Sequence, residues 1–95
     1  MRLKQTIQIF LAAYVKEHFS DARIFLFGSR ISDSEKGGDI DLLILTKERL
    51  NYSDLSRMRI EFYKTCGEQK IDLVNFTFDD IDPFKSIALS HSIEL

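Results

Sequence analysis

The sequence predicts one α/β (α+β) domain over residues 1–95, with a small mixed β-sheet of about three to four strands flanked by helices in the order α-β-β-α-β-α. Two observations support this fold class. Segments with apolar residues three and four positions apart, which is helical spacing, alternate with short apolar runs of strand length. The 95 residues, 44% of them hydrophobic, are enough for one core and too few for two.

The first half of the chain predicts one helix and two strands. Helical spacing extends to about His18 and comprises Leu3, Ile7, Phe10, Leu11, Tyr14 and Val15. Residues 23–27 form an apolar run of strand length that stops at Gly28-Ser29-Arg30. A polar segment with a Gly37-Gly38 turn then leads to residues 39–45, the second predicted strand.

The second half predicts two helices around a third strand. Ser53 is expected to cap a helix that ends at Gly67. Its apolar stripe consists of Leu55, Met58, Phe62 and Cys66. Residues 70–76 form the third strand, and the acidic turn before Pro83 is typical of a helix start. That last helix carries Phe84, Ile87, Ala88 and, near its end, His91.

The connections between the strands bring their polar ends together. The second strand, the helix and the third strand form a right-handed crossover, so these two strands should be parallel. The first strand joins the second without a full helix and can be antiparallel to it. This arrangement places the Gly28-Ser29 turn, Asp39, Asp41 and Asp72 at one end of the sheet.

The three aspartates at this end predict a metal site. Asp39 and Asp41 are two positions apart on a strand, so their side chains point to the same face, and Asp72 can point there too. Asp is disfavoured in strands, and a carboxylate among apolar neighbours needs a compensating cation. Lys70 is in phase with Asp72 and can take part of that role. Oxygen ligands favour a hard divalent ion, Mg²⁺ or Mn²⁺.

The expected metal suggests the substrate. Mg²⁺ usually binds through one or two carboxylates together with substrate phosphates, so a nucleoside triphosphate is the expected ligand. Gly28 allows the backbone to approach a phosphate closely, and Ser29 offers a hydroxyl and an amide. Arg30 can add a charge-assisted contact.

These motifs resemble the DNA polymerase β-type nucleotidyltransferase superfamily. Its motif is a hydrophobic residue, Gly, Gly or Ser, a spacer, and then Asp, a hydrophobic residue and an acid. The chain carries Phe27-Gly28-Ser29, nine residues from Arg30 to Gly38, and Asp39-Ile40-Asp41-Leu42. The local form looks like the minimal nucleotidyltransferases, including the MntA-like antitoxin group that pairs with all-helical HEPN toxins. Relatives often continue with a small residue, Arg and Gly, where this chain has Ile31, Ser32 and Asp33.

The resemblance implies a nucleotidyltransferase fold and a role for each motif residue. Asp39 and Asp41 would bind two Mg²⁺ ions, and Asp72 would be the third carboxylate, near the attacking hydroxyl. Gly28, Ser29 and Arg30 would hold the triphosphate. An acceptor hydroxyl would attack the α-phosphorus of ATP or another nucleoside triphosphate, and pyrophosphate would leave. The expected acceptor lies on a HEPN-domain partner, which makes the chain a type VII-like antitoxin that AMPylates a toxin.

Composition and net charge limit the ligands and the cellular compartment that are expected for this chain. A net charge of −2 argues against nucleic acid as a direct ligand, since such binders usually carry an excess of Lys and Arg. No apolar run approaches the ~20 residues of a membrane span. The single cysteine, Cys66, fits a reducing compartment and a place in the core, so a cytoplasmic protein is expected. A domain this small can also gain stability from a partner, as a homodimer or a heteromer.

Several residues that could suggest a function are instead interpreted as structural or surface residues. Asp80-Ile81-Asp82 repeats the Asp-x-Asp pattern, but it precedes Pro83, where carboxylates cap a helix, and is interpreted as structural. His18 and His91 are expected at the surface or facing a partner. The aromatic residues expected in the core are Phe10, Tyr14, Phe25, Phe27, Phe62, Phe76 and Phe84. No aromatic residue is assigned to the nucleobase.

Two alternatives to the adenylyltransferase remain at this stage. The chain could be a non-catalytic antitoxin that acts by complex formation only, which its small size and Asp33 in the phosphate loop favour. It could also be a polymerase or tailing fragment, against which the acidic charge and the lack of a template-binding domain argue.

Overall fold

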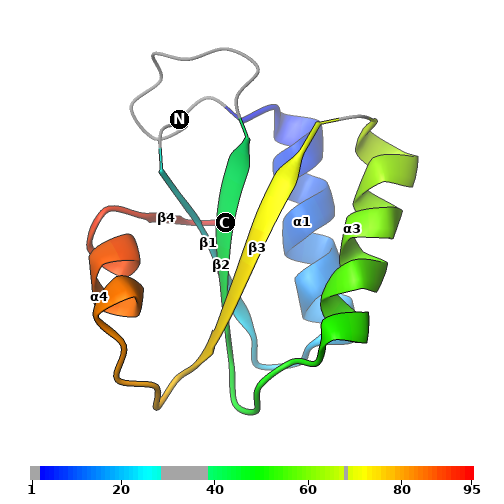
Figure 1. The fold of residues 1–95 in the computed structure, drawn as a ribbon. Helices are drawn as coiled ribbons and strands as arrows, with labels where there is room; N and C mark the ends of the chain where they lie inside the picture. The colour runs from blue at the N-terminus through cyan, green and yellow to red at the C-terminus, as the bar shows by residue number, and fades with distance from the viewer. Residues whose placement is uncertain (1–2, 29–38, 68) are drawn as a thin grey trace.

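The computed structural model describes residues 3–28, 39–67 and 69–95 and shows a four-stranded sheet with helices on both faces (Figure 1). Helices α1 and α3 cover one face, and the shorter α4 lies on the other. The elements are α1 Gln5–His18, β1 Arg23–Phe27, β2 Ile40–Thr46, α3 Tyr52–Cys66, β3 Ile71–Thr77, α4 Pro83–Ser90 and β4 Ile93–Glu94. The predicted order α-β-β-α-β-α is confirmed.

The sheet has the strand order β3-β2-β1-β4. β1 pairs antiparallel with β2, and β2 pairs parallel with β3, as the lengths of the connections predict. The two-residue strand β4, which pairs antiparallel with β1, was not predicted. It is too short to show a pattern of its own. Arg23 of β1 holds it by donating two hydrogen bonds, of 2.8 and 2.6 Å, to the carboxylate of Glu94, 71 positions further along the chain.

Side chains of the sheet alternate between two apolar layers. Ile40, Leu42 and Ile44 of β2 are fully buried in the larger layer, under α1 and α3. Leu43 and Leu45 belong to the smaller layer, which contains Ala88 of α4. The odd-numbered residues of β2 therefore face the α4 side, and only part of that side is covered by a helix.

The predicted first strand, residues 23–27, agrees with β1, whereas the other two predicted strands are each shifted by one residue. β2 begins at Ile40 instead of residue 39, and β3 runs from Ile71 to Thr77 instead of 70–76. The first ladder contact of β2 is the Ile40 amide, which donates to the carbonyl of Lys70 at 3.0 Å. Asp39 lies just outside this ladder, so its side chain is not held by strand pairing.

The prediction that Ser53 caps α3 is wrong. Asn51 is the N-cap: its side chain accepts from the Asp54 amide at 2.8 Å, and Asp54 accepts from the Asn51 amide at 3.2 Å. This reciprocal pair is a capping box. Ser53 lies inside the first turn. Gly67 ends the helix with φ +88°, as predicted.

No helix within residues 3–28, 39–67 and 69–95 combines the length and apolar character that crossing a bilayer requires.

The capping box makes a testable prediction about stability. Asn51→Ala removes the acceptor of the Asp54 amide and should lower the free energy of unfolding by about 1 kcal/mol. Ser53→Ala is the matched control and should change it by less than about 0.5 kcal/mol. Urea denaturation of both variants measures the difference, and a larger loss for Ser53→Ala would contradict the assignment.

Candidate active site

Three strand ends meet at one end of the sheet. β1 finishes there, and β2 and β3 both start there (Figure 1). In the register of the sheet, Phe27 lies opposite Asp41, and Asp41 lies opposite Asp72. The predicted juxtaposition of Gly28, Asp41 and Asp72 is therefore present in the backbone.

Asp41 and Asp72 project from the same face of the sheet. Their neighbours Ile40, Leu42 and Ile71 belong to the layer under α1 and α3, so the two aspartates face the α4 side. Both are partly exposed. Residues paired on adjacent strands lie about 5 Å apart, so the two carboxyl groups are neighbours. Ligands can reach them from the face that α4 leaves open.

Burial and neighbouring negative charges both disfavour the ionised form of the Asp41 carboxyl. Burial raises the pKa of the Asp41 carboxyl above its ordinary value, and the charges of Asp72 and Asp39 raise it further. The first cause is the loss of water around the carboxylate, and the other two are repulsion between like charges. A bound cation would remove both effects.

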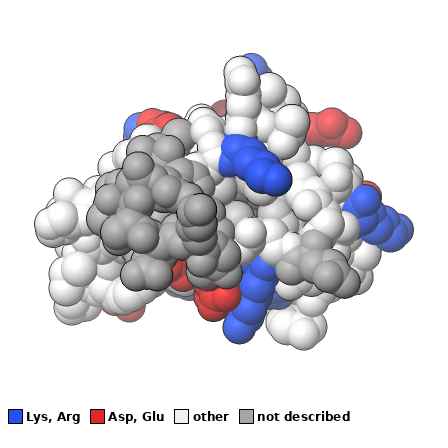
Figure 2. Space-filling view, turned by 90° about the horizontal axis from the view of Figure 1, so that it is seen from above, with Lys and Arg blue, Asp and Glu red and all other residues white. Residues whose placement is uncertain are grey.

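Asp39 lies at the rim of this group. Its side chain is 47% exposed, and it forms an ion pair with Lys70, whose Nζ is 3.7 Å from Oδ2. Lys70 was expected to compensate Asp72, but it contacts Asp39. Seen from above, acidic side chains lie beside basic ones at this end of the molecule (Figure 2). An exposed pair of this kind is weak, so Asp39 can exchange Lys70 for another cation.

Gly28 is required by its contact with Asp41. It has φ +83°, which L-residues with a side chain rarely adopt. A Cβ atom at this position would overlap the carboxylate of Asp41. Its predicted role was close approach to a phosphate. The structure adds that this glycine makes room for the central aspartate.

Two of the predicted phosphate-binding residues, Ser29 and Arg30, lie outside the described residues. The same holds for Ile31, Ser32 and Asp33. Their assignment to the triphosphate stays a prediction from the sequence.

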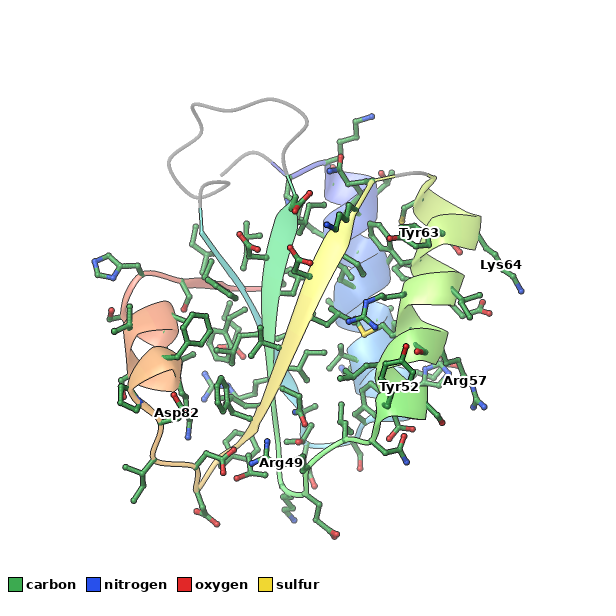
Figure 3. All side chains as sticks on the ribbon, viewed as in Figure 1. Arg49, Tyr52, Arg57, Tyr63, Lys64 and Asp82 are labelled. Carbon is green, nitrogen blue, oxygen red and sulfur yellow. The ribbon has the colours of Figure 1, made fainter. Side chains whose placement is uncertain are left out.

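The second Asp-x-Asp pattern is structural, as predicted. Asp82 caps α4 by accepting from the Phe84 amide at 2.8 Å. Asp80 accepts from the Thr77 amide and from Arg49, each at 2.8 Å at its shortest. These hydrogen bonds, the one from Thr77 first, lower the pKa of Asp80. Figure 3 places Asp82 at the start of α4 and Arg49 near the lower end of the sheet.

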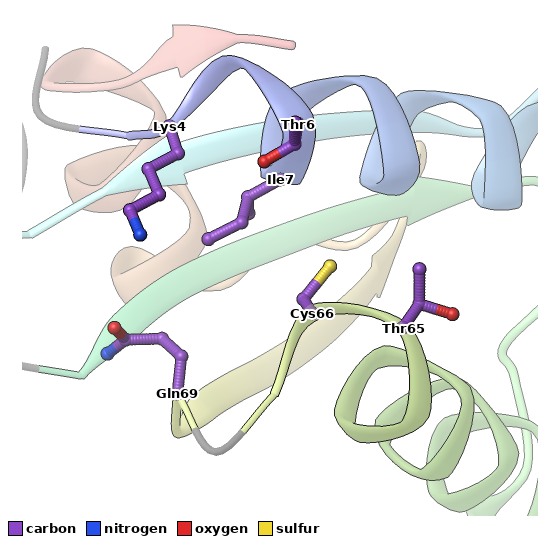
Figure 4. Close-up of a pocket in the computed structure, with 6 residues that line it drawn as sticks. All are labelled: Lys4, Thr6, Ile7, Thr65, Cys66 and Gln69. Atoms are coloured by element: carbon purple, nitrogen blue, oxygen red, sulfur yellow. The ribbon is translucent and has the colours of Figure 1, made fainter.

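A hollow of about 360 Å³ on the other side of the sheet is not part of this site. It lies between the start of α1 and the end of α3 (Figure 4) and is lined by Lys4, Thr6, Ile7, Thr65, Cys66 and Gln69. Burial raises the pKa of the Cys66 thiol, and its side chain packs against the core, as predicted. A raised pKa disfavours the thiolate, so Cys66 is a poor nucleophile.

The expectation that the named aromatic residues all lie in the core is wrong for Phe84. Its side chain is 46% exposed, and Ile87, one turn further along α4, is 64% exposed. Together with Phe27 they line a groove that reaches Gly28. Helical periodicity cannot reveal this, because α4 has only eight residues and covers little of the sheet.

The donor atoms fit a divalent metal that is completed by its substrate. Among the residues that the structure describes, no three Asp, Glu, His or Cys side chains lie together so that they could hold a metal ion, and the predicted trio of Asp39, Asp41 and Asp72 is therefore not gathered as one ligand set. Mg²⁺ does not need such a set, because it usually keeps water or phosphate oxygens beside one or two carboxylates. The neighbouring carboxylates of Asp41 and Asp72 would be ligands of this kind, and burial, together with the charges of Asp72 and Asp39, raises the pKa of Asp41.

A glycine turn that ends one strand, beside two aspartates at the starts of two parallel strands, is the architecture of a nucleotidyltransferase domain. The chain belongs to the family described as Polymerase beta, Nucleotidyltransferase, which matches residues 10–95. No curated protein matches the chain by sequence.

Solved structures with the same fold come from toxin–antitoxin complexes. One is a toxin–antitoxin structure with AMP-PNP, with a TM-score of 0.72 and 17% identity, which covers 97% of this chain and 72% of that chain. Another is a tri-AMPylated Shewanella oneidensis HEPN toxin in complex with its MNT antitoxin, with a TM-score of 0.70, 15% identity and coverage of 97% and 71%. The MntA–HepT complex has a TM-score of 0.69, 14% identity and coverage of 96% and 70%. At these identities the likeness establishes the fold.

The contact between Gly28 and Asp41 predicts a difference between two glycine substitutions. Gly28→Ala and Gly67→Ala both place a side chain at positive φ, a strained conformation that costs about 1–3 kcal/mol. Only Gly28→Ala also displaces a carboxylate, because no atom lies within 4 Å of a Cβ at Gly67. Urea denaturation should therefore show a loss for both variants, with the disturbance of the candidate active site confined to Gly28→Ala. The backbone amide signals of Asp41 and Asp72 should shift in that variant alone, and equal behaviour of the two variants would argue against the contact.

The raised pKa of Asp41 predicts a gain in stability when its charge is removed. The folded-state pKa lies above the unfolded value of ~3.9, so the folded state binds more protons between these two values. Stability is therefore lost as the pH rises through that window, and the full penalty is present at neutral pH. Asp41→Asn should unfold at higher urea concentration than wild type at pH 7, with a gain that shrinks towards pH 4.

Glu17→Gln, on the exposed side of α1, is the control for the loss of one negative charge and should change stability by less than about 0.5 kcal/mol. A metal-free Asp41→Asn protein that is less stable than wild type at pH 7 would show that the carboxylate is not under strain.

Proposed function

We propose that this chain is a Mg²⁺-dependent nucleotidyltransferase that moves AMP from ATP to a hydroxyl group on a HEPN-type partner protein, and so acts as an antitoxin. The observation that carries the proposal is the juxtaposition of Gly28, Asp41 and Asp72, with Asp39 near enough to repel Asp41. Family membership supports the reaction class. Two acidic groups on one face, with a third at its rim, are a poor surface for any ligand except a cation and the anion that accompanies it.

The reaction that this arrangement serves is an in-line displacement. An acceptor oxygen forms a bond to the α-phosphorus, the bond from that phosphorus to the bridging oxygen breaks, and pyrophosphate leaves with the electron pair. Asp39 and Asp41 would hold the metal ions, which would neutralise the charge on the phosphates and on the attacking oxygen. Asp72, on the adjacent strand, would accept the hydroxyl proton. Gly28, Ser29 and Arg30 would bind the β- and γ-phosphates.

The donor and the partner are inferred from proteins with the same fold. One of them was solved with AMP-PNP, and another is an MNT antitoxin bound to a tri-AMPylated HEPN toxin. We infer that a second polypeptide supplies the acceptor surface, because the fold is shared with an MNT antitoxin that was solved in complex with a HEPN toxin. A cytoplasmic location, one domain over residues 1–95, and assembly as a heteromer or homodimer belong to the same proposal.

A second candidate is an antitoxin that neutralises its partner by binding alone. The ion pair between Lys70 and Asp39 favours it, because this contact supplies a cation to one of the expected metal ligands. Asp33, in the predicted phosphate loop, would also repel a triphosphate. Calorimetry with ATP separates the two candidates, because Mg²⁺-dependent binding is expected only of the enzyme.

The test of transfer is co-production with the protein encoded by the adjacent reading frame, followed by the intact mass of both chains. Wild type should add one or more AMP units to the partner, and Asp39→Asn or Asp41→Asn should reduce this by at least 100-fold. Asp82→Asn is the matched control, since it removes an acid from the other Asp-x-Asp pattern while Asn remains a good N-cap. An unmodified partner with wild type would contradict the enzymatic proposal.

A further inference from the structure

An apolar groove of about 270 Å³ lies between the end of β1 and helix α4. Its walls are Phe27 and Gly28 on one side and Phe84, Ile87, Ala88 and His91 on the other. Phe84, Ile87 and His91 are three and four positions apart, so they form one stripe along α4. We call these six residues the α4 groove.

The α4 groove is built for an uncharged flat group. None of its six residues is Asp, Glu, Lys or Arg. The ring of Phe84 is held at 5.9 Å from that of Phe27, edge to face, and at 6.3 Å from that of Phe76. These contacts fix the ring while leaving it 46% exposed, so one side remains free for a ligand. The volume is below the ~300–1,000 Å³ of pockets for whole drug-sized ligands, which suits a single heterocycle.

The α4 groove is continuous with the candidate active site through Gly28. This residue lines the groove, and it is also the residue whose Cβ would meet the carboxylate of Asp41. A ligand that crosses Gly28 would have one end beside Asp41 and Asp72 and the other against Phe84. The first end must be compatible with cations and phosphate, and the second must be apolar and flat. A nucleotide has these two ends.

We propose that the α4 groove is the nucleobase subsite, with the base stacked on Phe84 and covered by Ile87. This inference rests on the proposed nucleotidyltransferase function and adds the residues that hold the base. The stripe could instead contact a protein partner, but two features favour the base: the groove is small, and its aromatic ring is fixed in advance. Stacking on an aromatic side chain does not depend on base identity, so the groove should accept ATP and GTP alike.

The test compares ATP with inorganic triphosphate, which lacks the base, by calorimetry on the full chain with Mg²⁺. Phe84→Ala and Ile87→Ser should each weaken ATP binding about tenfold, which corresponds to the loss of one stacking contact. Both should leave triphosphate binding unchanged. Ile87→Ser guards against a folding defect, because Ile87 is 64% exposed. Ile81→Ser, at a 99% exposed apolar residue outside the groove, is the control.

Two outcomes would overturn the nucleobase subsite while leaving the enzyme proposal in place. One is that Phe84→Ala and Ile87→Ser bind ATP with the same affinity as wild type. This outcome includes the case in which the two variants bind ATP normally but bind the partner protein more weakly. The other is wild type that binds triphosphate as tightly as ATP. Wild type that binds neither ligand would overturn both proposals together.

Discussion

The arrangement around Asp41 is the constraint on which the rest of this site depends. Its carboxylate lies between the backbone of Gly28 and the side chain of Asp72, and burial, followed by the charges of Asp72 and Asp39, raises its pKa. Such an arrangement costs free energy in the isolated protein. A glycine at positive φ makes it sterically possible, and strand pairing on both sides of β2 holds the backbone of Asp41 in this position. The paired backbone of the sheet therefore keeps the unfavourable charge of Asp41 at this position.

The two faces of the sheet have different roles: one stabilises the fold, and the other carries the candidate site. The face under α1 and α3 contains the larger apolar layer, with residues of β2 that are fully buried. Among the described residues, the helix on the opposite face is α4, which has eight residues and leaves both the aspartates and the α4 groove accessible. A longer helix there would bury more apolar surface but would cover the site. Partial coverage is therefore the physical condition for a ligand to reach Asp41.

The two Asp-x-Asp patterns of the chain have different roles, and the contacts of their carboxylates explain the difference. Asp80 and Asp82 are saturated by hydrogen bonds from Arg49, Thr77 and Phe84, and those from Thr77 and Arg49 lower the pKa of Asp80. Asp41 has like charges beside it, and its pKa is raised. A carboxylate that its own chain stabilises needs no ligand, whereas one that its neighbours destabilise gains from a cation.

The sequence by itself determined the order of helices and strands, the parallel and antiparallel pairing and the meeting of Gly28 with Asp41 and Asp72. These follow from local periodicity and from the length of the connections, which neighbouring residues encode. Only the tertiary structure decided the strand β4, the ion pair of Asp39 with Lys70 and the exposure of Phe84 in the α4 groove. Each of these depends on how distant segments pack, so no local pattern contains it. The N-cap of α3 was also decided by the folded geometry: the cap is Asn51, although the sequence pattern predicted Ser53.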